Sequence, residues 1–333
     1  MKAYELHPRE GFDALQLVDR PSPPVGPGDV RVRVRAVSLN YRDTVIARGA
    51  RKAKRPMVPV SDGAGEVVEV GAGVTRLRVG DRVAGAFFPT WIDGELADSH
   101  HANAQGGSID GMLVEEKVLP QLAWVKLPEH LSFEEGATLP CAGVTAWHAL
   151  FEAARLSPGE SVLAQGTGGV SIFVLQLARA AGAQVVVTSS SADKRERATQ
   201  LGAAHTIDYK AVPAWGEAVK AWSGRGVDVG VEVGGPGTFD QTVTALRYGG
   251  TMSILGVLTG TKGEVNTYNL FHKGLHVHGI YVGSVRMFEA LNRALTAAQI
   301  KPVIDRTFGF DEARAAYEHL ASGAHFGKVV IRV

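Results

Sequence analysis

The residues whose types and spacing suggest chemistry most directly form a glycine-rich turn in the middle of the chain. An apolar segment, SVLAQ, runs into Gly166, Thr167, Gly168, Gly169, Val170 and Ser171. In such a turn one glycine makes a tight bend and the next lets backbone N–H groups approach a pyrophosphate, whose charge the following helix N-terminus favours. Ser171 replaces the third glycine of this pattern. The turn predicts a dinucleotide-binding site, although an ordinary turn before a helix has a similar composition.

The end of the next apolar segment, QVVVT, bears on which dinucleotide is bound. A unit that binds NAD places an acidic side chain there for the ribose, whereas this chain places Ser189, Ser190 and Ser191, followed by Lys194. A carboxylate would repel a 2′-phosphate, but hydroxyl groups and an ammonium would bind it through charge-assisted hydrogen bonds. Ser190 or Ser191 could instead cap the next helix, and both roles can coexist. The segment favours NADP(H), with NAD(H) as the alternative.

The overall charge restricts the expected partners to small molecules or copies of the chain itself. The 333 residues include 35 Lys and Arg and 34 Asp and Glu, a formal net charge of +1, so no global field attracts nucleic acid or a membrane surface. The single cysteine, Cys141, excludes an internal disulfide and a four-cysteine zinc site. No apolar run is long enough to span a membrane, and MKAYELHPRE lacks a signal-peptide core. We expect a cytoplasmic protein.

The elements that would position these residues follow two patterns along the chain. Up to about residue 122 the sequence is β-rich, as in the alternating DVRVRVRAVSL. From residue 123 onward, strands alternate with amphipathic helices, and the six expected strands are SVLAQ, QVVVTS, HTIDY, VDVGVEV, TMSILGVL and LHVHGIYVG. Six strands with helical crossovers predict an α/β fold with a doubly wound parallel sheet, the Rossmann arrangement.

Several motifs together resemble the medium-chain dehydrogenase/reductase superfamily over essentially the whole chain. They are the glycine-rich turn, LPCAGVTAWHAL, VEVGGPG and GKVVI, and they resemble its quinone oxidoreductase and zinc-free, alcohol-dehydrogenase-like branch. The resemblance implies a β-rich GroES-like catalytic domain, residues 1–122 and 283–333, and a Rossmann cofactor domain, residues 123–282. It also implies a cofactor in the cleft between the domains and, usually, a dimer.

The resemblance also implies which residues contact the cofactor. The turn from Gly166 to Ser171 would meet the pyrophosphate, and Asn40 could bind the cofactor or the substrate. Ser189, Ser190, Lys194 and Tyr209 would lie at the 2′-phosphate, and Lys328 would reach the cofactor from the returning domain. The residues implied on the nicotinamide side are Thr145, Val233, Gly234, Leu255, Gly256 and Val257.

The chain departs from the zinc-dependent members of that superfamily at three of four positions. Asn40 stands where they have a cysteine, and Ser61 and Asp62 stand where they have histidine and glutamate; only Cys141 is retained. A tetrahedral zinc ion needs three or four nitrogen, sulfur or oxygen ligands held together. We therefore expect no zinc. The remaining histidines lack companions at zinc spacing, so we expect structural or surface roles for His100, His101, His272, His276 and His278.

Without a metal, a conjugated carbonyl compound is an easier hydride acceptor than a simple ketone, because the π system spreads the developing charge. We therefore expect an oxidoreductase that transfers hydride from NADPH to a quinone or to a conjugated enone or aldehyde, with Asn40 and Tyr41 as candidate catalytic donors. Tyr41 could equally form a pocket wall. An alcohol dehydrogenase of unknown substrate and a non-catalytic NADPH-binding sensor remain alternatives. The apolar segment LHVHGIYVG predicts an edge strand that pairs two copies into a homodimer.

Overall fold

The chain folds into two compact units, each with its own sheet. The computed structural model describes residues 1–50 and 56–333. Unit 1 comprises Met1–Val144 and Val282–Val333, and unit 2 comprises Thr145–Tyr281. The first boundary falls later than residue 123, where the sequence placed it, because a short strand after that point pairs within the sheet of unit 1.

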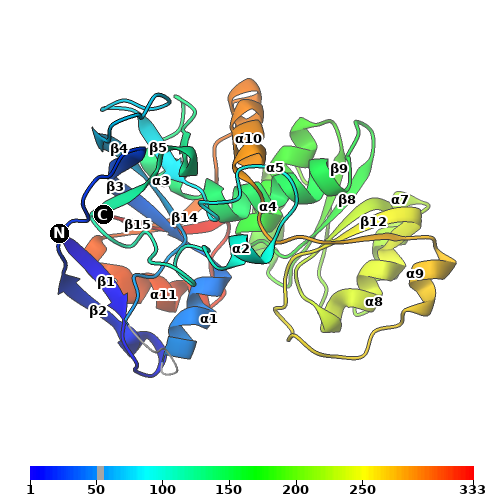
Figure 1. The fold of residues 1–333 in the computed structure, drawn as a ribbon. Coiled ribbons are helices and arrows are strands. Elements are labelled where there is room, and N and C mark those ends of the chain that lie inside the picture. The colour runs from blue at the N-terminus through cyan, green and yellow to red at the C-terminus, as the bar shows by residue number, and fades with distance from the viewer. Residues whose placement is uncertain (51–55) are drawn as a thin grey trace. The chain divides into compact units, whose positions relative to one another are not determined.

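Unit 1 is built around a seven-stranded sheet in the order β14-β15-β3-β4-β5-β7, with β6 pairing to β3 (Figure 1). The long strand β3 organises it, since its first half pairs with β6 and its second half with β15 from the C-terminus. The alternating residues Val30, Val32 and Val34 are buried, as the period-two pattern predicted. The strands of unit 1 are β1 (Lys2–Leu6), β2 (Leu15–Asp19), β3 (Asp29–Leu39), β4 (Asp62–Val70), β5 (Arg82–Gly85), β6 (Glu116–Pro120), β7 (Trp124–Lys126), β14 (Ile304–Phe308) and β15 (Lys328–Arg332).

Short helices cover the sheet of unit 1, and β1 and β2 form a separate two-stranded sheet. An apolar core joins strands of the sheet to α11, whose Ala316 and Tyr317 are fully buried. The helices of unit 1 are η1 (Gly11–Ala14), α1 (Tyr41–Gly49), α2 (Asp98–His101), η3 (Gln121–Ala123), α3 (Phe133–Ala137), η4 (Leu139–Gly143), α10 (Val285–Ala298), η6 (Phe310–Glu312) and α11 (Ala313–Ala321), and α4 (Val144–Trp147) crosses into unit 2.

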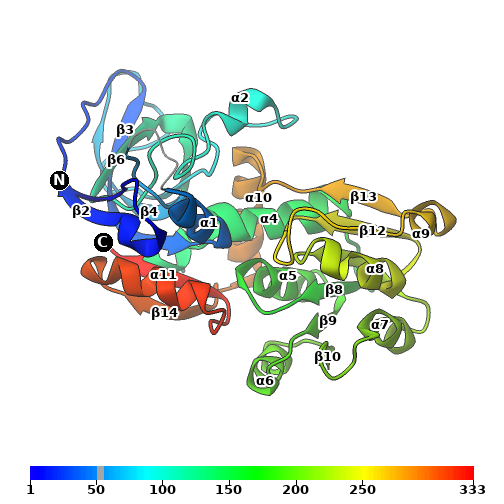
Figure 2. The same cartoon turned by 90° about the horizontal axis from the view of Figure 1, so that it is seen from below.

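Unit 2 is a parallel six-stranded sheet in the order β10-β9-β8-β11-β12-β13. Every pairing described in it is parallel, which confirms the predicted doubly wound sheet. Figure 2 shows α6 and α7 beside the β10 end of the sheet. The elements of unit 2 are η5 (His148–Ala153), β8 (Ser161–Gln165), α5 (Gly169–Ala180), β9 (Gln184–Thr188), α6 (Ala192–Gln200), β10 (His205–Ile207), α7 (Trp215–Ser223), β11 (Val227–Glu232), α8 (Pro236–Ala245), β12 (Leu246–Ile254), α9 (Tyr268–His272) and β13 (His276–Gly279).

The strand order of unit 2 places a switch point between β8 and β11. From β8 the chain runs outward through β9 and β10, and then returns to the other side of β8 to continue with β11. In open parallel sheets, ligands bind outside the carboxyl ends of the strands at such a point. The loops after β8 and β11 are therefore the natural place for a ligand of this unit. In the described chain, no helix has the length and apolar character required to cross a membrane.

Candidate functional site

The glycine-rich turn lies at the switch point of the unit 2 sheet. β8 ends at Gln165, Gly166 follows with a φ of +70°, and α5 begins at Gly169. Gly168 precedes the helix and carries no side chain to cap its first N–H groups, which suits this helix end to an anion. The Ser171 hydroxyl donates to the carbonyl oxygen of Gln165 over 2.6 Å. This contact explains how a serine fits in place of the third glycine.

A buried carboxylate that we did not identify from the sequence lies beside this turn. Glu232 ends β11 and has no exposed surface. Its Oε1 accepts hydrogen bonds from the backbone N–H groups of Gly234 and Gly235, over 2.7 and 2.8 Å, and from the Thr238 hydroxyl over 2.6 Å. Its Oε2 accepts from Gln165 Nε2 over 2.6 Å. The available sequence signal was an acidic residue at the end of a buried strand, directly before VGG.

Five residues predicted on the nicotinamide side lie in the adjacent loops after β11 and β12: Val233, Gly234, Leu255, Gly256 and Val257. The Leu255 N–H donates to the carbonyl oxygen of Glu232 over 3.0 Å. A Cβ atom on Gly256 would lie 2.1 Å from the carbonyl oxygen of Val233, so only glycine allows the two loops to approach this closely. Thr145, also predicted on the nicotinamide side, is the first residue of unit 2 and is buried.

The residues predicted at the 2′-phosphate lie where β9 and β10 end and α6 begins: Ser189, Ser190, Lys194 and Tyr209. The Ser189 N–H donates to the carbonyl oxygen of Ile207 over 3.0 Å, so the segments after β9 and β10 run side by side. Ser191 Oγ accepts from the Lys194 N–H over 3.4 Å and caps α6. The capping role considered for this serine is therefore confirmed, and Lys194 falls in the first turn of the helix.

An acidic residue does lie in this region, but it is already paired. Asp208 follows β10, and its Oδ2 accepts from Arg195 Nη1 over 2.9 Å. Its Oδ1 accepts from the backbone N–H groups of Ala211 and Lys210, over 3.1 and 3.0 Å. The hydrogen bond from Ala211, with those from Lys210 and Arg195, holds the pKa of Asp208 below its usual range. Asp208 is thus tied to its own loop and to Arg195.

In unit 1, Asn40 occupies the junction between β3 and α1, and a lysine holds its side chain. Asn40 N donates to Asp43 Oδ2 over 2.7 Å, an arrangement typical of a helix N-terminus. Lys328 Nζ donates to Asn40 Oδ1 over 2.5 Å and to the carbonyl oxygen of Leu39 over 2.7 Å. Lys328, which was predicted to reach the cofactor, is buried at these contacts, whereas Tyr41 is about half exposed.

Asp62 and Cys141 lie in the same buried cluster. The Asp62 carboxylate accepts from the Ser61 hydroxyl over 2.7 Å and from the Cys141 N–H over 3.0 Å. Val60, which directly precedes Ser61 and Asp62 in the chain, has a φ of +69°. This is a left-handed conformation that a β-branched residue rarely adopts. Such strain persists only where the surrounding structure enforces it, and it often accompanies functional sites.

Burial shifts the pKa values of the ionisable groups in this cluster. It raises the pKa of Asp62, against the opposing effects of Lys328 and the Asn40 amide, and it lowers the pKa of Lys328, against the charge of Asp62. It also raises the pKa of Asp43 to about 6, with Arg42 opposing. The Cys141 thiol is surrounded by protein although part of the residue is exposed, and burial raises its pKa far above the usual range. Burial therefore disfavours the thiolate form of Cys141 when no cation is bound.

This donor set does not fit a tetrahedral zinc ion. A tetrahedral zinc ion needs three or four ligands held together. Of Asn40, Ser61, Asp62 and Cys141, only Asp62 and Cys141 are residue types that zinc commonly binds, and the Asp62 carboxylate already accepts two hydrogen bonds. Lys328 Nζ donates to Asn40 Oδ1, so the side-chain oxygen that Asn40 could offer to a metal is already hydrogen-bonded. Within residues 1–50 and 56–333, no three His, Cys, Asp or Glu side chains are grouped so that they could hold a metal ion.

Three of the histidines considered as metal candidates pack against aromatic rings. His100 stacks on Trp91 with ring centroids 5.8 Å apart, and His101 meets Phe88 edge-on at 5.5 Å. His272 stacks on Tyr268 at 5.3 Å. The other two, His276 and His278, are exposed on β13.

The chain matches two protein families, one within unit 1 and the other over most of unit 2 and the first residues that follow it. Residues 26–129 match the alcohol dehydrogenase GroES-like domain, and residues 169–297 match the zinc-binding dehydrogenase family. The second match includes neither Asn40 nor Cys141, so its name carries no information about the cluster in unit 1.

Relatives of known name match the chain over almost its full length. A zinc-type alcohol dehydrogenase-like protein of Schizosaccharomyces pombe is 43% identical, covering 99% of this chain and 99% of its own length. A quinone oxidoreductase of Pseudomonas aeruginosa is 32% identical, covering 96% of each chain.

Solved structures show the same architecture. The crystal structure of an NAD-dependent alcohol dehydrogenase, 31% identical, matches with a TM-score of 0.90 over 100% of both chains. A crotonyl-CoA carboxylase/reductase in complex with NADP, 25% identical, matches with a TM-score of 0.85 over 100% of this chain and 94% of its own. The similarity therefore includes both units.

Proposed function

Because the chain belongs to the medium-chain dehydrogenase/reductase superfamily, we propose that it is an NADPH-dependent enzyme that reduces a quinone or a conjugated enone or aldehyde without zinc. The observation that carries this proposal is the cluster of unit 1. Its Asp62 carboxylate accepts hydrogen bonds from the Ser61 hydroxyl and the Cys141 N–H, and Asn40 Oδ1 accepts one from Lys328 Nζ, so these oxygens are engaged within the protein. Without a Lewis acid, a delocalised acceptor is the favoured substrate.

The preference for NADPH is supported by the end of β9 and the start of α6. Hydroxyl groups of Ser189 and Ser190, with the Lys194 ammonium and Tyr209, would bind the 2′-phosphate. The nearby carboxylate, Asp208, is engaged by Arg195 and by backbone N–H groups, so it is not available to the ribose in the way that NAD-binding units require.

In the proposed reaction the bound cofactor supplies hydride, and the residues of the chain bind and orient. The turn from Gly166 to Ser171 would hold the pyrophosphate through backbone N–H groups, with the loops after β11 and β12 on the nicotinamide side. The cofactor would deliver its hydride to the electron-poor carbon of the conjugated acceptor, and Tyr41 or water would donate the proton that completes the reduction. Asn40 would donate a hydrogen bond to the acceptor oxygen.

The test is an assay of purified protein with NADPH or NADH and a panel of quinones, enones, alkenals and alcohols. We expect loss of NADPH absorbance with the conjugated acceptors, and weaker activity with NADH. Oxidation of alcohols with no turnover of quinones or enones would contradict the proposal and select an alcohol dehydrogenase, which the names of two relatives favour. Tight NADPH binding without turnover of any compound would instead select a non-catalytic sensor.

A further inference from the structure

A network of hydrogen bonds spans the switch point of the unit 2 sheet. Gln165 is the last residue of β8 and directly precedes the glycine-rich turn, and Glu232 is the last residue of β11. The two strands are neighbours, with Ala164 paired to Val231. Their terminal side chains therefore meet between the two loops at which a ligand of this sheet is expected.

The hydrogen bonds of Gln165 determine which of its side-chain atoms faces the Glu232 carboxylate. Gln165 Nε2 donates to Glu232 Oε2 over 2.6 Å, and Gln165 Oε1 accepts from the Val233 N–H over 3.2 Å. An amide nitrogen only donates and an amide oxygen only accepts, so these two contacts together set the orientation of the Gln165 side chain. The Thr242 hydroxyl also contacts both Gln165 Nε2 and Glu232 Oε2.

The carboxylate organises the loop after β11 rather than filling space. An ion is removed from water only where donors replace the water. Uncharged donors surround the Glu232 carboxylate. They are the N–H groups of Gly234 and Gly235, the hydroxyls of Thr238 and Thr242 and the Gln165 amide. Two apolar side chains at positions 165 and 232 could hold the strand ends together without any hydrogen-bond donors around them. The carboxylate instead turns two backbone N–H groups inward and fixes the start of α8.

We propose that Glu232 and Gln165 are positioning residues for the dinucleotide site. They hold the loop after β11 against the end of β8, and so keep the glycine-rich turn and its neighbour in the conformation that receives the cofactor. Neither side chain contacts the cofactor itself. This inference rests on the proposed function, because it requires that a nicotinamide dinucleotide binds at this edge of the sheet.

The first test is the variant Glu232→Gln, which keeps the size of the side chain but replaces one oxygen with an amide nitrogen. Three donors crowd the Oε1 side, so the new nitrogen faces Gln165 Nε2 and two donors oppose each other. We expect the dissociation constant for NADPH, measured by calorimetry, to rise about tenfold or more.

The second test restores the contact with its direction reversed. In the double variant Gln165→Glu/Glu232→Gln, the amide at position 232 donates to the carboxylate at position 165, which still accepts from the Val233 N–H. We expect this protein to bind NADPH within about threefold of the wild type, because the two changes are coupled. Losses that simply add in the double variant would overturn the inference.

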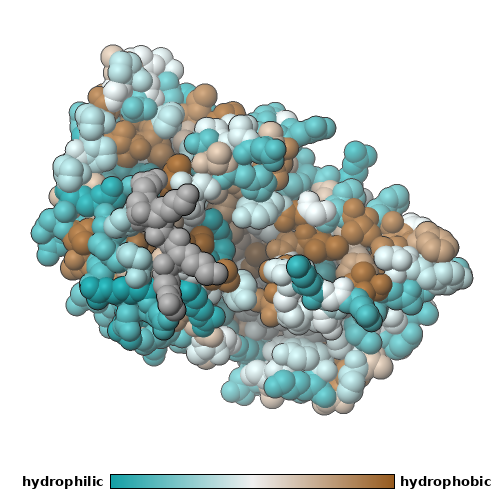
Figure 3. Space-filling view, turned by 60° about the horizontal axis from the view of Figure 1, so that its bottom comes forward, coloured by the Kyte–Doolittle hydropathy of each residue, from teal (hydrophilic) through white to brown (hydrophobic). Residues whose placement is uncertain are grey.

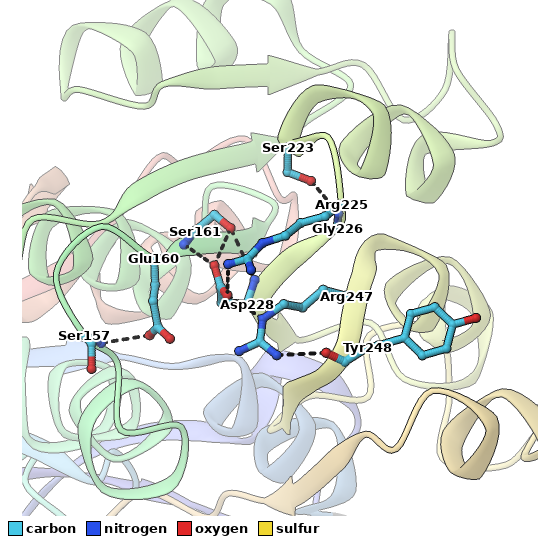
Figure 4. A network of polar contacts seen from close by, with 9 residues as sticks. All are labelled: Ser157, Glu160, Ser161, Ser223, Arg225, Gly226, Asp228, Arg247 and Tyr248. Carbon is cyan, nitrogen blue, oxygen red and sulfur yellow. Dashed lines mark hydrogen bonds and ion pairs between the residues drawn. The ribbon is translucent and has the colours of Figure 1, made fainter.

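Asp228→Asn is the matched control, because Asp228 is the other buried carboxylate of β11 and lies at the opposite end of the strand. It accepts hydrogen bonds from Ser161 N and Oγ, each over 2.8 Å, and from Arg247 Nε over 2.5 Å (Figure 4). We expect this variant to unfold at a lower urea concentration while its dissociation constant for NADPH stays unchanged.

The outcomes separate the inference from the proposed function. If the wild type binds NADPH and Glu232→Gln binds it equally well, the inference is wrong and the proposed function stands. If the wild type binds neither NADPH nor NADH, both are wrong. If Glu232→Gln does not fold, recovery of a folded, NADPH-binding double variant supports the inference, and failure of the double variant to bind contradicts it.

Discussion

Among single residues, the contact between Lys328 and Asn40 links the two ends of the chain. Both were singled out from the sequence as site residues, but they lie 288 positions apart, and no local pattern predicts that one donates to the other. They meet because β15 pairs antiparallel with β3, with Val329 opposite Leu39. The residue types were therefore sufficient to predict which residues belong to the site. The hydrogen bonds between them could not be predicted, because they depend on long-range strand pairing.

The variant Lys328→Met should show whether Lys328 positions the Asn40 side chain or binds the cofactor. Removing the Lys328 amino group leaves the buried carboxyl groups of Asp62 and Asp43 without the positive charge nearby that favours their ionised forms. We therefore expect the free energy of unfolding in urea to fall by about 3 kcal/mol. We also expect kcat to fall more than KM for NADPH rises, because the Asn40 amide loses its partner.

The control is Lys117→Met, another buried lysine of unit 1, whose Nζ donates to the carbonyl oxygens of Asp110 and Gly111. It should destabilise the protein without changing kcat. A large rise in KM for NADPH in Lys328→Met at unchanged kcat would show instead that this lysine serves the cofactor.

The Asp43 carboxyl gives a pH dependence of known sign. Burial raises its pKa in the folded protein from 3.8 to about 6, so the folded state binds this proton more tightly than the unfolded state does. The contribution of Asp43 to stability is therefore largest below pH 3.8 and is lost as the pH rises towards 6. Relative to the wild type, Asp43→Asn should become more stable over that rise, as measured by urea unfolding at several pH values. A pH-independent difference between the two proteins would contradict this.

At the level of elements, the glycine-rich turn and its flanking strands were predictable because each is encoded locally. SVLAQ, the turn and the apolar face of α5 follow one another within a few residues, and the parallel sheet follows from six apolar strands that alternate with helices. The Gln165–Glu232 contact was not predictable, since it joins residues 67 positions apart on strands whose adjacency appears only in the folded sheet. The short strand β7 was likewise assigned to a unit only through its pairing with β5.

The junction of β9 with α6 should determine the preference between the two cofactors. Lys194→Ala removes one positive charge from the predicted 2′-phosphate site while Ser191 continues to cap α6. We expect the dissociation constant for NADPH to rise about tenfold, with little change for NADH, because an ammonium contributes only where the extra phosphate is present. Calorimetric titration of each cofactor measures both values. Equal losses for NADPH and NADH would remove Lys194 from the phosphate site.

For the whole molecule, the outer strand of unit 2 suggests assembly with a second copy. β13 is last in the order of its sheet, so one of its edges is unpaired in the described chain. Large exposed hydrophobic side chains occur on and around it, and Figure 3 shows hydrophobic side chains gathered on unit 2. They include Tyr248, Leu258, Tyr268, Phe271, Val277 and Tyr281. An unpaired edge with apolar neighbours is suited to pairing with its twin about a two-fold axis.

We therefore propose a homodimer through β13 and expect sedimentation velocity to show a dimer. Phe271, whose side chain is 72% exposed, provides the test, because Phe271→Asp would place a charge in the interface and should shift the protein towards monomer. Lys210→Asp, an exposed change elsewhere in unit 2, should leave the dimer intact. A wild-type protein that sediments as a monomer at all concentrations would contradict the proposal.

The most direct test of the zinc-free mechanism is the rate of NADPH-dependent enone reduction by one preparation before and after treatment with a strong zinc chelator. The zinc-free mechanism predicts an unchanged kcat/KM in protein whose zinc content, measured on the same sample, is far below one ion per chain. Loss of activity on chelation, with recovery on adding zinc, would show that the reaction depends on zinc and would contradict the zinc-free mechanism.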